Sequence, residues 1–147
     1  MKDIYQLVNE HESNLEDFLN WQIESGPTNN FREFAEFNAT AQDAFKYAAI
    51  LYPKFILVEE NVVLADHYEE KNWASWRETL DPKDTANLIN HLHVDNYLTN
   101  DSQGAHKLEQ GLGDLLAFFW LLAVNHQFPG KNVLVEYDGD VVNVTNQ

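Results

Sequence analysis

Cysteine is absent from this 147-residue chain, and glycine occurs only six times. Without a thiol the chain has no disulfide, no thiolate zinc ligand and no cysteine nucleophile. The few glycines build no phosphate-binding loop, because Gly111 and Gly113 lead into Asp114, whose charge repels phosphate. No serine has the flanking glycines of a nucleophile elbow. These absences favour a protein that is not an enzyme and that carries no cofactor.

Basic residues are also scarce: 9 Lys and Arg stand against 24 Asp and Glu, which gives a net charge of −15. A negative field of this size repels nucleic acid and anionic membranes and speeds association with cationic partners. The alternative is that the charge only keeps the protein soluble. The segment Met1–Tyr5 lacks the apolar core of a signal peptide, which favours a soluble, cytoplasmic protein.

The content of 44% hydrophobic and 13% aromatic residues argues against disorder. A chain of this length buries the core of one domain, residues 1–147, without disulfides or metals. The longest apolar run, Leu115–Val124, is too short for a bilayer, which needs about 20 residues. A helix that is apolar on every side is a buried helix, so we expect one near 114–126. Gly111 and Gly113 predict a kink or break before it.

Two β-hairpins are predicted, near 55–65 and 132–144, each of them after a helix. The first turns near Glu60-Asn61, and the apolar residues on both faces of its strands predict burial on both sides. The second turns at Asp138-Gly139, the residue pair of a type I′ turn. One face of this second hairpin is almost entirely apolar, comprising Val133, Val135, Tyr137, Val142 and Val144. A lone hairpin is barely stable, so we expect the two to pair in one antiparallel sheet against the helices, an α+β fold.

Helices are predicted in three other places. Apolar residues recur at helical spacing from Ile4 to Ile23, with a break expected near Ser13-Asn14. Thr40 begins a capping box for a helix over 41–52, and Asp81-Pro82 begins a helix that should run to about His93. The polar stretches 25–30 and 96–104 are predicted loops, and the secondary structure of the aromatic segment 31–37 stays open.

The segment His91-Leu92-His93-Val94-Asp95 is the densest group of potential metal ligands. On a strand the two histidines point the same way and can share a metal, whereas on a helix residues two apart diverge. The Asp81-Pro82 start favours the helix, and further ligands from His67, His126 or a carboxylate would be needed. A metal-dependent enzyme that uses His91, His93 and Asp95 is therefore the alternative, and no metal site is the main expectation.

The strongest candidate for a binding surface is a group of aromatic residues beside acidic ones. Aromatic residues anchor protein interfaces, and carboxylates steer the approach of a basic partner. The competing interpretation is that the tryptophans are core residues on one helix face, which we favour for at least one of them. The group comprises Asp66, Tyr68, Glu69, Glu70, Trp73 and Trp76.

In size, acidity, lack of cysteine and α+β architecture, the whole chain resembles the immunity proteins of bacterial contact-dependent and other polymorphic toxin systems. No motif carries this resemblance. It implies a bacterial protein that docks a basic partner, a cognate toxin domain such as a nuclease, and blocks it. The other alternative is a regulatory module on which the sequence says nothing.

Overall fold

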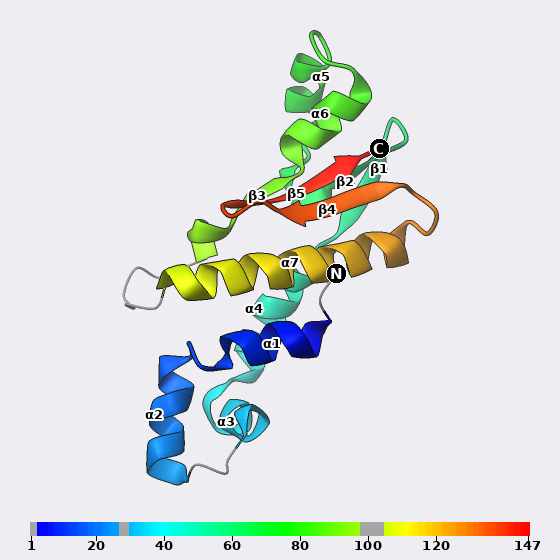
Figure 1. Cartoon of the computed structure of the whole chain (residues 1–147). Coiled ribbons are helices and arrows are strands. Elements are labelled where there is room, and N and C mark those ends of the chain that lie inside the picture. The colour runs from blue at the N-terminus through cyan, green and yellow to red at the C-terminus, as the bar shows by residue number, and fades with distance from the viewer. Residues whose placement is uncertain (1–2, 27–29, 98–104) are drawn as a thin grey trace.

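The computed structural model describes residues 3–26, 30–97 and 105–147. Within these residues the chain forms an α+β fold with two small antiparallel sheets, as the sequence predicts in class (Figure 1). The helices are α1 (Ile4–Glu12), α2 (Glu16–Ser25), α3 (Phe31–Asn38), α4 (Ala41–Leu51), α5 (Glu70–Trp76), α6 (Pro82–Ile89) and α7 (Ala105–Gln127), with 3-10 turns η1 (Ala65–His67) and η2 (Val94–Tyr97). The strands are β1 (Phe55–Val58), β2 (Asn61–Leu64), β3 (His91–His93), β4 (Val133–Tyr137) and β5 (Val141–Asn146).

Figure 1 shows α7 running across the middle of the molecule, with the strands on one side and α1 and α4 on the other. Helices α2 and α3 lie at one end of the molecule, and α5 and α6 lie at the opposite end. None of the helices in the described ranges has the length and apolar character needed to cross a membrane. The predicted loop residues 27–29 and 98–104 lie outside the described residues.

The N-terminal helices begin and end where local signals place them. The predicted break at Ser13-Asn14 is confirmed, because α1 ends at Glu12 and α2 begins at Glu16. The Thr40 capping box is also confirmed: its hydroxyl accepts from the Asp43 N–H, and the Asp43 carboxylate accepts from the Thr40 N–H. The open segment 31–37 forms α3, which Asn30 caps in the same way.

Helix α7 passes through both glycines without a break, so the predicted kink is wrong. The glycines are close-approach points instead. A Cβ at Gly111 would lie 2.7 Å from the His11 ring, and one at Gly113 would lie 2.5 Å from the Tyr137 ring. Packing of α1 and β4 directly on the helix backbone outweighs the ~1 kcal/mol that a helical glycine costs.

The apolar part of α7 forms the centre of the main core, but it is not buried on every side. Leu116, Trp120, Ala123 and Val124 are buried, whereas Leu122 on the opposite side is 46% exposed. The expectation of a fully buried helix is therefore wrong for that side. The buried residues pack with strand residues from both sheets, including Phe55, Val62, Val135, Val142 and Val144.

The two predicted hairpins form, but they do not pair with each other. Strands β1 and β2 make a two-stranded sheet, and the second sheet has the order β3-β5-β4. The outer edge of β2 is covered by two buried asparagine side chains rather than by a strand. The Asn90 Oδ1 accepts from the Leu64 N–H at 2.8 Å, and the Asn146 Oδ1 accepts from the Val62 N–H at 2.8 Å. Both side-chain amides also donate to the Val62 carbonyl oxygen.

The burial pattern of the second hairpin agrees with the prediction, although its turn does not. Val135 pairs with Val144 and Tyr137 with Val142, and these residues share the face that lies against α7. The turn lies one residue later, around Gly139-Asp140, because the Asp138 N–H donates to the Val141 carbonyl oxygen at 3.1 Å. It is not type I′, since only Gly139 has positive φ, and the Asp138 carboxylate accepts from the Asp140 and Val141 N–H groups. The first hairpin turns at Glu59-Glu60, one residue before the predicted position.

Helix α6 ends at Ile89, four residues earlier than predicted, and His91–His93 forms β3. The reason is tertiary. Asn90 is fully buried and binds β2 with its side chain, while its carbonyl oxygen accepts from the Val144 N–H. After this residue the chain continues along β5 in an antiparallel register, with Leu92 opposite Val142.

Candidate functional site

The aromatic residues of the predicted binding surface pack inward. Trp73 is only 5% exposed and belongs to a second core cluster with Val63, Ala86 and Ile89. Tyr68 and Trp76 are half-buried against the same cluster. The interpretation of Trp73 as a core residue is therefore confirmed, and this residue is not available as an interface anchor.

The acidic members of that group, Asp66, Glu69 and Glu70, are exposed. Glu69 also accepts a hydrogen bond from the Asn72 side chain at 2.7 Å. The nearby Trp73 indole N–H donates to Glu59 Oε1 at 3.0 Å, which ties α5 to the β1–β2 turn. At this end of the molecule the aromatic side chains therefore stabilise the fold, and the carboxylates remain at the surface.

A second surface also combines apolar and acidic residues, and it forms a groove between α1, α7 and β4. The groove has a volume of about 430 Å³. We call it the acidic groove. Asp114 and Glu136 carry its charge and Tyr137 lies along it, over apolar residues that include Leu7, Ala117, Phe118 and Val135.

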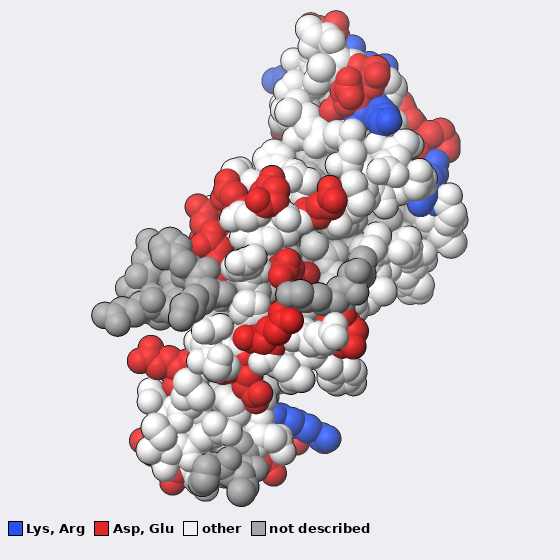
Figure 2. Space-filling model, viewed as in Figure 1, with Lys and Arg blue, Asp and Glu red and all other residues white. Residues whose placement is uncertain are grey.

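Tyr137 lies among several carboxylates that make this groove negative. Burial raises the pKa of the Tyr137 hydroxyl above its ordinary value, and the charges of Glu109, Asp140, Asp114 and Asp138 raise it further. These carboxylates come from α7 and from the β4–β5 turn. Figure 2 shows that acidic side chains gather over the middle of this face, whereas the basic ones lie toward its two ends.

Exposed aromatic residues mark a further surface on α3 and α4. Phe37 is 79% exposed and Phe45 is 80% exposed, and α4 has no buried residue. Singly exposed apolar side chains are common, whereas a contiguous patch of them is typical of surfaces that bind other proteins. Beside them a cavity of about 660 Å³ is lined by aromatic residues such as Trp21 and Phe34.

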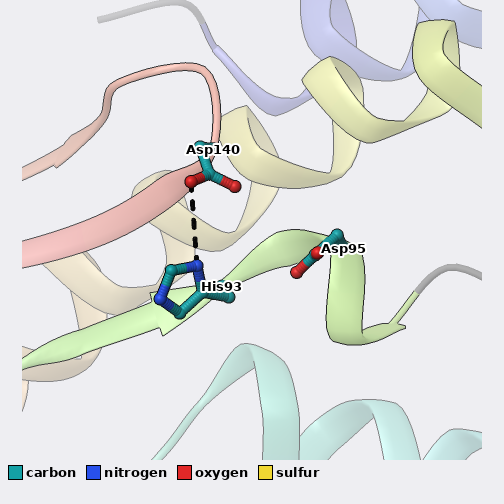
Figure 3. A group of neighbouring side chains, drawn as sticks. All are labelled: His93, Asp95 and Asp140. Carbon is teal, nitrogen blue, oxygen red and sulfur yellow. Dashed lines mark ion pairs between the residues drawn. The ribbon is translucent and has the colours of Figure 1, made fainter.

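The histidine segment is a strand, and the structure brings His93 and Asp95 of the alternative prediction together but leaves His91 outside their group. The rings of His91 and His93 are 5.5 Å apart between centres, and that of His67 is 6.4 Å from His91. His126 lies elsewhere, in contact with Tyr52. Figure 3 shows that His93 and Asp95 lie beside Asp140 of the β4–β5 turn. Asp140 was not predicted as a ligand from the sequence.

Sequence reasoning missed the acidic groove because its parts are distant in the chain. Asp114 and Tyr137 meet only because Gly113 allows the tyrosine ring to lie on the α7 backbone. One signal was present in β4, where the alternation of Val135 with Glu136 predicts that the carboxylate points away from the core.

Comparison with known proteins finds no relatives. No protein-family model matches the chain, and neither a curated protein nor a solved structure matches it.

Proposed function

We propose that this chain is an acidic binding protein that docks a basic protein partner through the acidic groove and neutralises it. The observation that carries the proposal is the groove itself, in which the carboxylates of Asp114 and Glu136 border an apolar surface. Apolar contacts supply affinity at the centre of an interface, and charges around them speed the encounter and select the partner.

The charge distribution supports a cationic partner. Four carboxylates act on Tyr137 strongly enough to raise the pKa of its hydroxyl beyond the effect of burial. A partner that brings Lys or Arg into this groove would relieve the mutual repulsion of these carboxylates. Because such attraction acts at a distance, it raises the association rate most at low ionic strength.

The class of protein that fits this behaviour is the bacterial immunity protein. The proposal is that the chain blocks a cognate toxin domain by covering it, without chemistry of its own. Its net charge of −15 and its cysteine-free α+β fold support this assignment. The exposed aromatic residues Phe37 and Phe45 add further surface of the kind that partners cover.

The test is affinity capture from a lysate of the source organism, with the wild-type chain and charge-reversal variants side by side. We expect wild type to retain one basic protein at low salt and less of it at high salt. Asp114→Lys with Glu136→Lys should abolish retention, because both carboxylates of the groove become cations.

A matched control places the same charges at the other end of the molecule, as Glu69→Lys with Glu70→Lys. Both carboxylates are exposed, so the control changes the net charge equally and leaves the groove intact. Equal loss of the partner in both double variants would reduce the interaction to net charge, and loss only in the control would move the interface to α5. Once captured, the partner is assayed for toxicity with and without this chain.

A further inference from the structure

Strand β3 leads into a group of three side chains that can ligate a metal ion. His93, Asp95 and Asp140 each offer one ligand atom, and these atoms lie within 4.8 Å of one another. In Figure 3 the Asp140 carboxylate faces the His93 ring, and Asp95 points toward the same space from the start of η2. We propose that this His93–Asp95–Asp140 cluster binds a divalent transition-metal ion of the Zn²⁺ class, a site beyond the docking function proposed above.

The donor set selects the type of ion. One imidazole nitrogen and two carboxylate oxygens suit Zn²⁺ and its neighbours in the first transition row, whereas Ca²⁺ and Mg²⁺ take oxygen ligands. Ligand atoms at the usual Zn²⁺ distances lie roughly 3–4 Å apart around the ion. His93 Nδ1 and Asp140 Oδ2 are already 3.7 Å apart.

The ligand atoms need to move only a short distance to bind one ion, and the side chains that carry them are free to rotate. Bringing ligand atoms from within 4.8 Å to a shared ion takes a shift of about 1 Å. The side chains of His93 and Asp140 are 47% and 66% exposed, so rotation about their own bonds supplies this shift without moving the core. Water completes the coordination of the ion on its open side.

The backbone under the cluster is held by the core. His93 and Asp95 flank Val94, which is fully buried. The Val94 N–H donates to the carbonyl oxygen of Asp140 at 3.0 Å, and Asp138 Oδ1 accepts from the Asp140 N–H at 3.1 Å. The buried Val94 thus holds the backbone of His93 and Asp95, its two neighbours in the chain. It also holds the backbone of Asp140, through the hydrogen bond. The backbone that carries the three ligands is therefore fixed, and only their side chains have to move to bind an ion.

A further imidazole lies near the cluster on the same strand, outside the group of atoms within 4.8 Å of one another. His91 lies two residues before His93, and its ring centre is 5.5 Å from that of His93. Its Nδ1 lies 2.9 Å from the Leu88 carbonyl oxygen. A carbonyl oxygen only accepts, so Nδ1 carries the proton and the Nε2 of the neutral ring keeps the lone pair that a metal needs. His67 is held in the same form by the Ile89 carbonyl oxygen.

The experiment is a calorimetric titration of the full, tag-free chain with ZnCl₂, and with MgCl₂ for comparison. We expect one Zn²⁺ per chain and no saturation by Mg²⁺ in the same range. His93→Ala and Asp140→Asn should each weaken Zn²⁺ binding at least about tenfold, a loss of the size expected when metal-site groups are removed. His91→Ala should weaken it less. Zn²⁺ should also raise the melting temperature of wild type more than that of either variant.

Two controls separate ligation from general attraction. Asp114→Asn removes one negative charge from the neighbouring acidic groove, and His126→Ala removes an imidazole that contacts Tyr52. Both should bind Zn²⁺ as wild type does. Circular dichroism checks that each variant is folded, and Asp95→Asn provides another ligand variant if one of the first two is not.

Several results would overturn the site. One is that wild type takes up no Zn²⁺ at millimolar concentration. Another is that it binds several ions with an affinity that the ligand variants leave unchanged, which is the behaviour of scattered surface carboxylates. Equal weakening by Asp114→Asn and Asp140→Asn would reduce the effect to charge. None of these results bears on partner capture, which is tested with Asp114→Lys and Glu136→Lys in the absence of metal.

Discussion

At the turn of the β1–β2 hairpin, Glu59 and Glu60 both have positive φ, 46° and 67°, whereas at the β4–β5 turn only Gly139 does, with φ 105°. Two positive φ values in a two-residue loop are those of a type I′ turn, which Asn-Gly and Asp-Gly adopt most readily. The first hairpin therefore has the tight geometry without the favoured residues. The second has Asp138-Gly139 but turns around Gly139-Asp140, where only Gly139 has positive φ.

The difference is explained by what surrounds each turn. Glu59 accepts from the Trp73 indole N–H and from Arg77, and Glu60 is held by Lys131 through both its carbonyl and its carboxylate oxygens. Contacts from α5 and from the segment before β4 thus hold two residues in an unfavourable backbone region. Asp138, by contrast, bonds the N–H groups of its own turn. Tertiary contacts shape the first turn, and local contacts shape the second.

The strand edges differ in the same sense. The outer edge of β5 is paired with β3, whereas the outer edge of β2 is met by the side chains of Asn90 and Asn146. The first hairpin thus depends on distant side chains at both its turn and its edge. Three sets of variants test this dependence.

The largest effect is expected at the edge of β2. Asn90→Ala should lower the free energy of unfolding by about 3 kcal/mol, because it leaves the buried Leu64 N–H without its acceptor and removes a donor from the Val62 carbonyl. The measurement is chemical denaturation at pH 7. Asn143→Ala, on β5, removes only an amide contact to Asp138 and should cost under about 1 kcal/mol. Equal losses of unfolding free energy in the two variants would show that the hydrogen bonds of Asn90 to β2 contribute no more than the amide contact of Asn143.

Exchanging residue types at the turns should give changes of opposite sign. Glu60→Gly should raise stability by about 0.5–1 kcal/mol, since glycine adopts positive φ freely and the exposed ion pair with Lys131 contributes little. Gly139→Ala should lower it by about 1 kcal/mol through backbone strain, because a Cβ there meets no other atom. Loss of stability in Glu60→Gly would mean that the Lys131 contact outweighs the strain.

The smallest effect is a pH dependence at the first turn. The hydrogen bond from Trp73 lowers the pKa of Glu59 from its ordinary value of 4.5, and Arg77 lowers it further. A lowered folded-state pKa gives stability that is present above the ordinary value and is lost as the pH falls through the folded value. The difference in urea midpoint between wild type and Glu59→Gln should therefore shrink from pH 7 to pH 3. A constant difference would show that the charge of Glu59 is not involved.

Elements defined by neighbouring residues could be predicted from the sequence, and those defined by distant ones could not. The Thr40 capping box and the apolar face of the second hairpin depend on spacings of two or three residues, and both are present. The end of α6 was missed because Asn90 leaves the helix to bind β2, which lies 26 to 28 positions earlier. The separation of the two sheets was missed for the same reason.

The candidate sites follow the same division. His91, His93 and Asp95 are close in sequence and were identified as possible ligands, but Asp140 joins them only through the pairing of β3 with β5. The inward packing of Trp73 depends on Val63 and Ile89, which lie on other elements. A pattern of aromatic and acidic residues alone does not show which of the aromatic side chains are buried in the core.

The hydrogen bond between the Val62 N–H and Asn146 spans 84 positions of the chain, which matters during synthesis. At ~5–20 residues per second, a ribosome needs roughly 4–17 s to add that length, whereas a hairpin forms in ~1–10 μs. The residues of the β1–β2 hairpin thus leave the ribosome early, but its β2 edge stays incomplete until the last strand emerges. In that interval its apolar strands are open to chaperones, and the rate of translation sets how long they stay so.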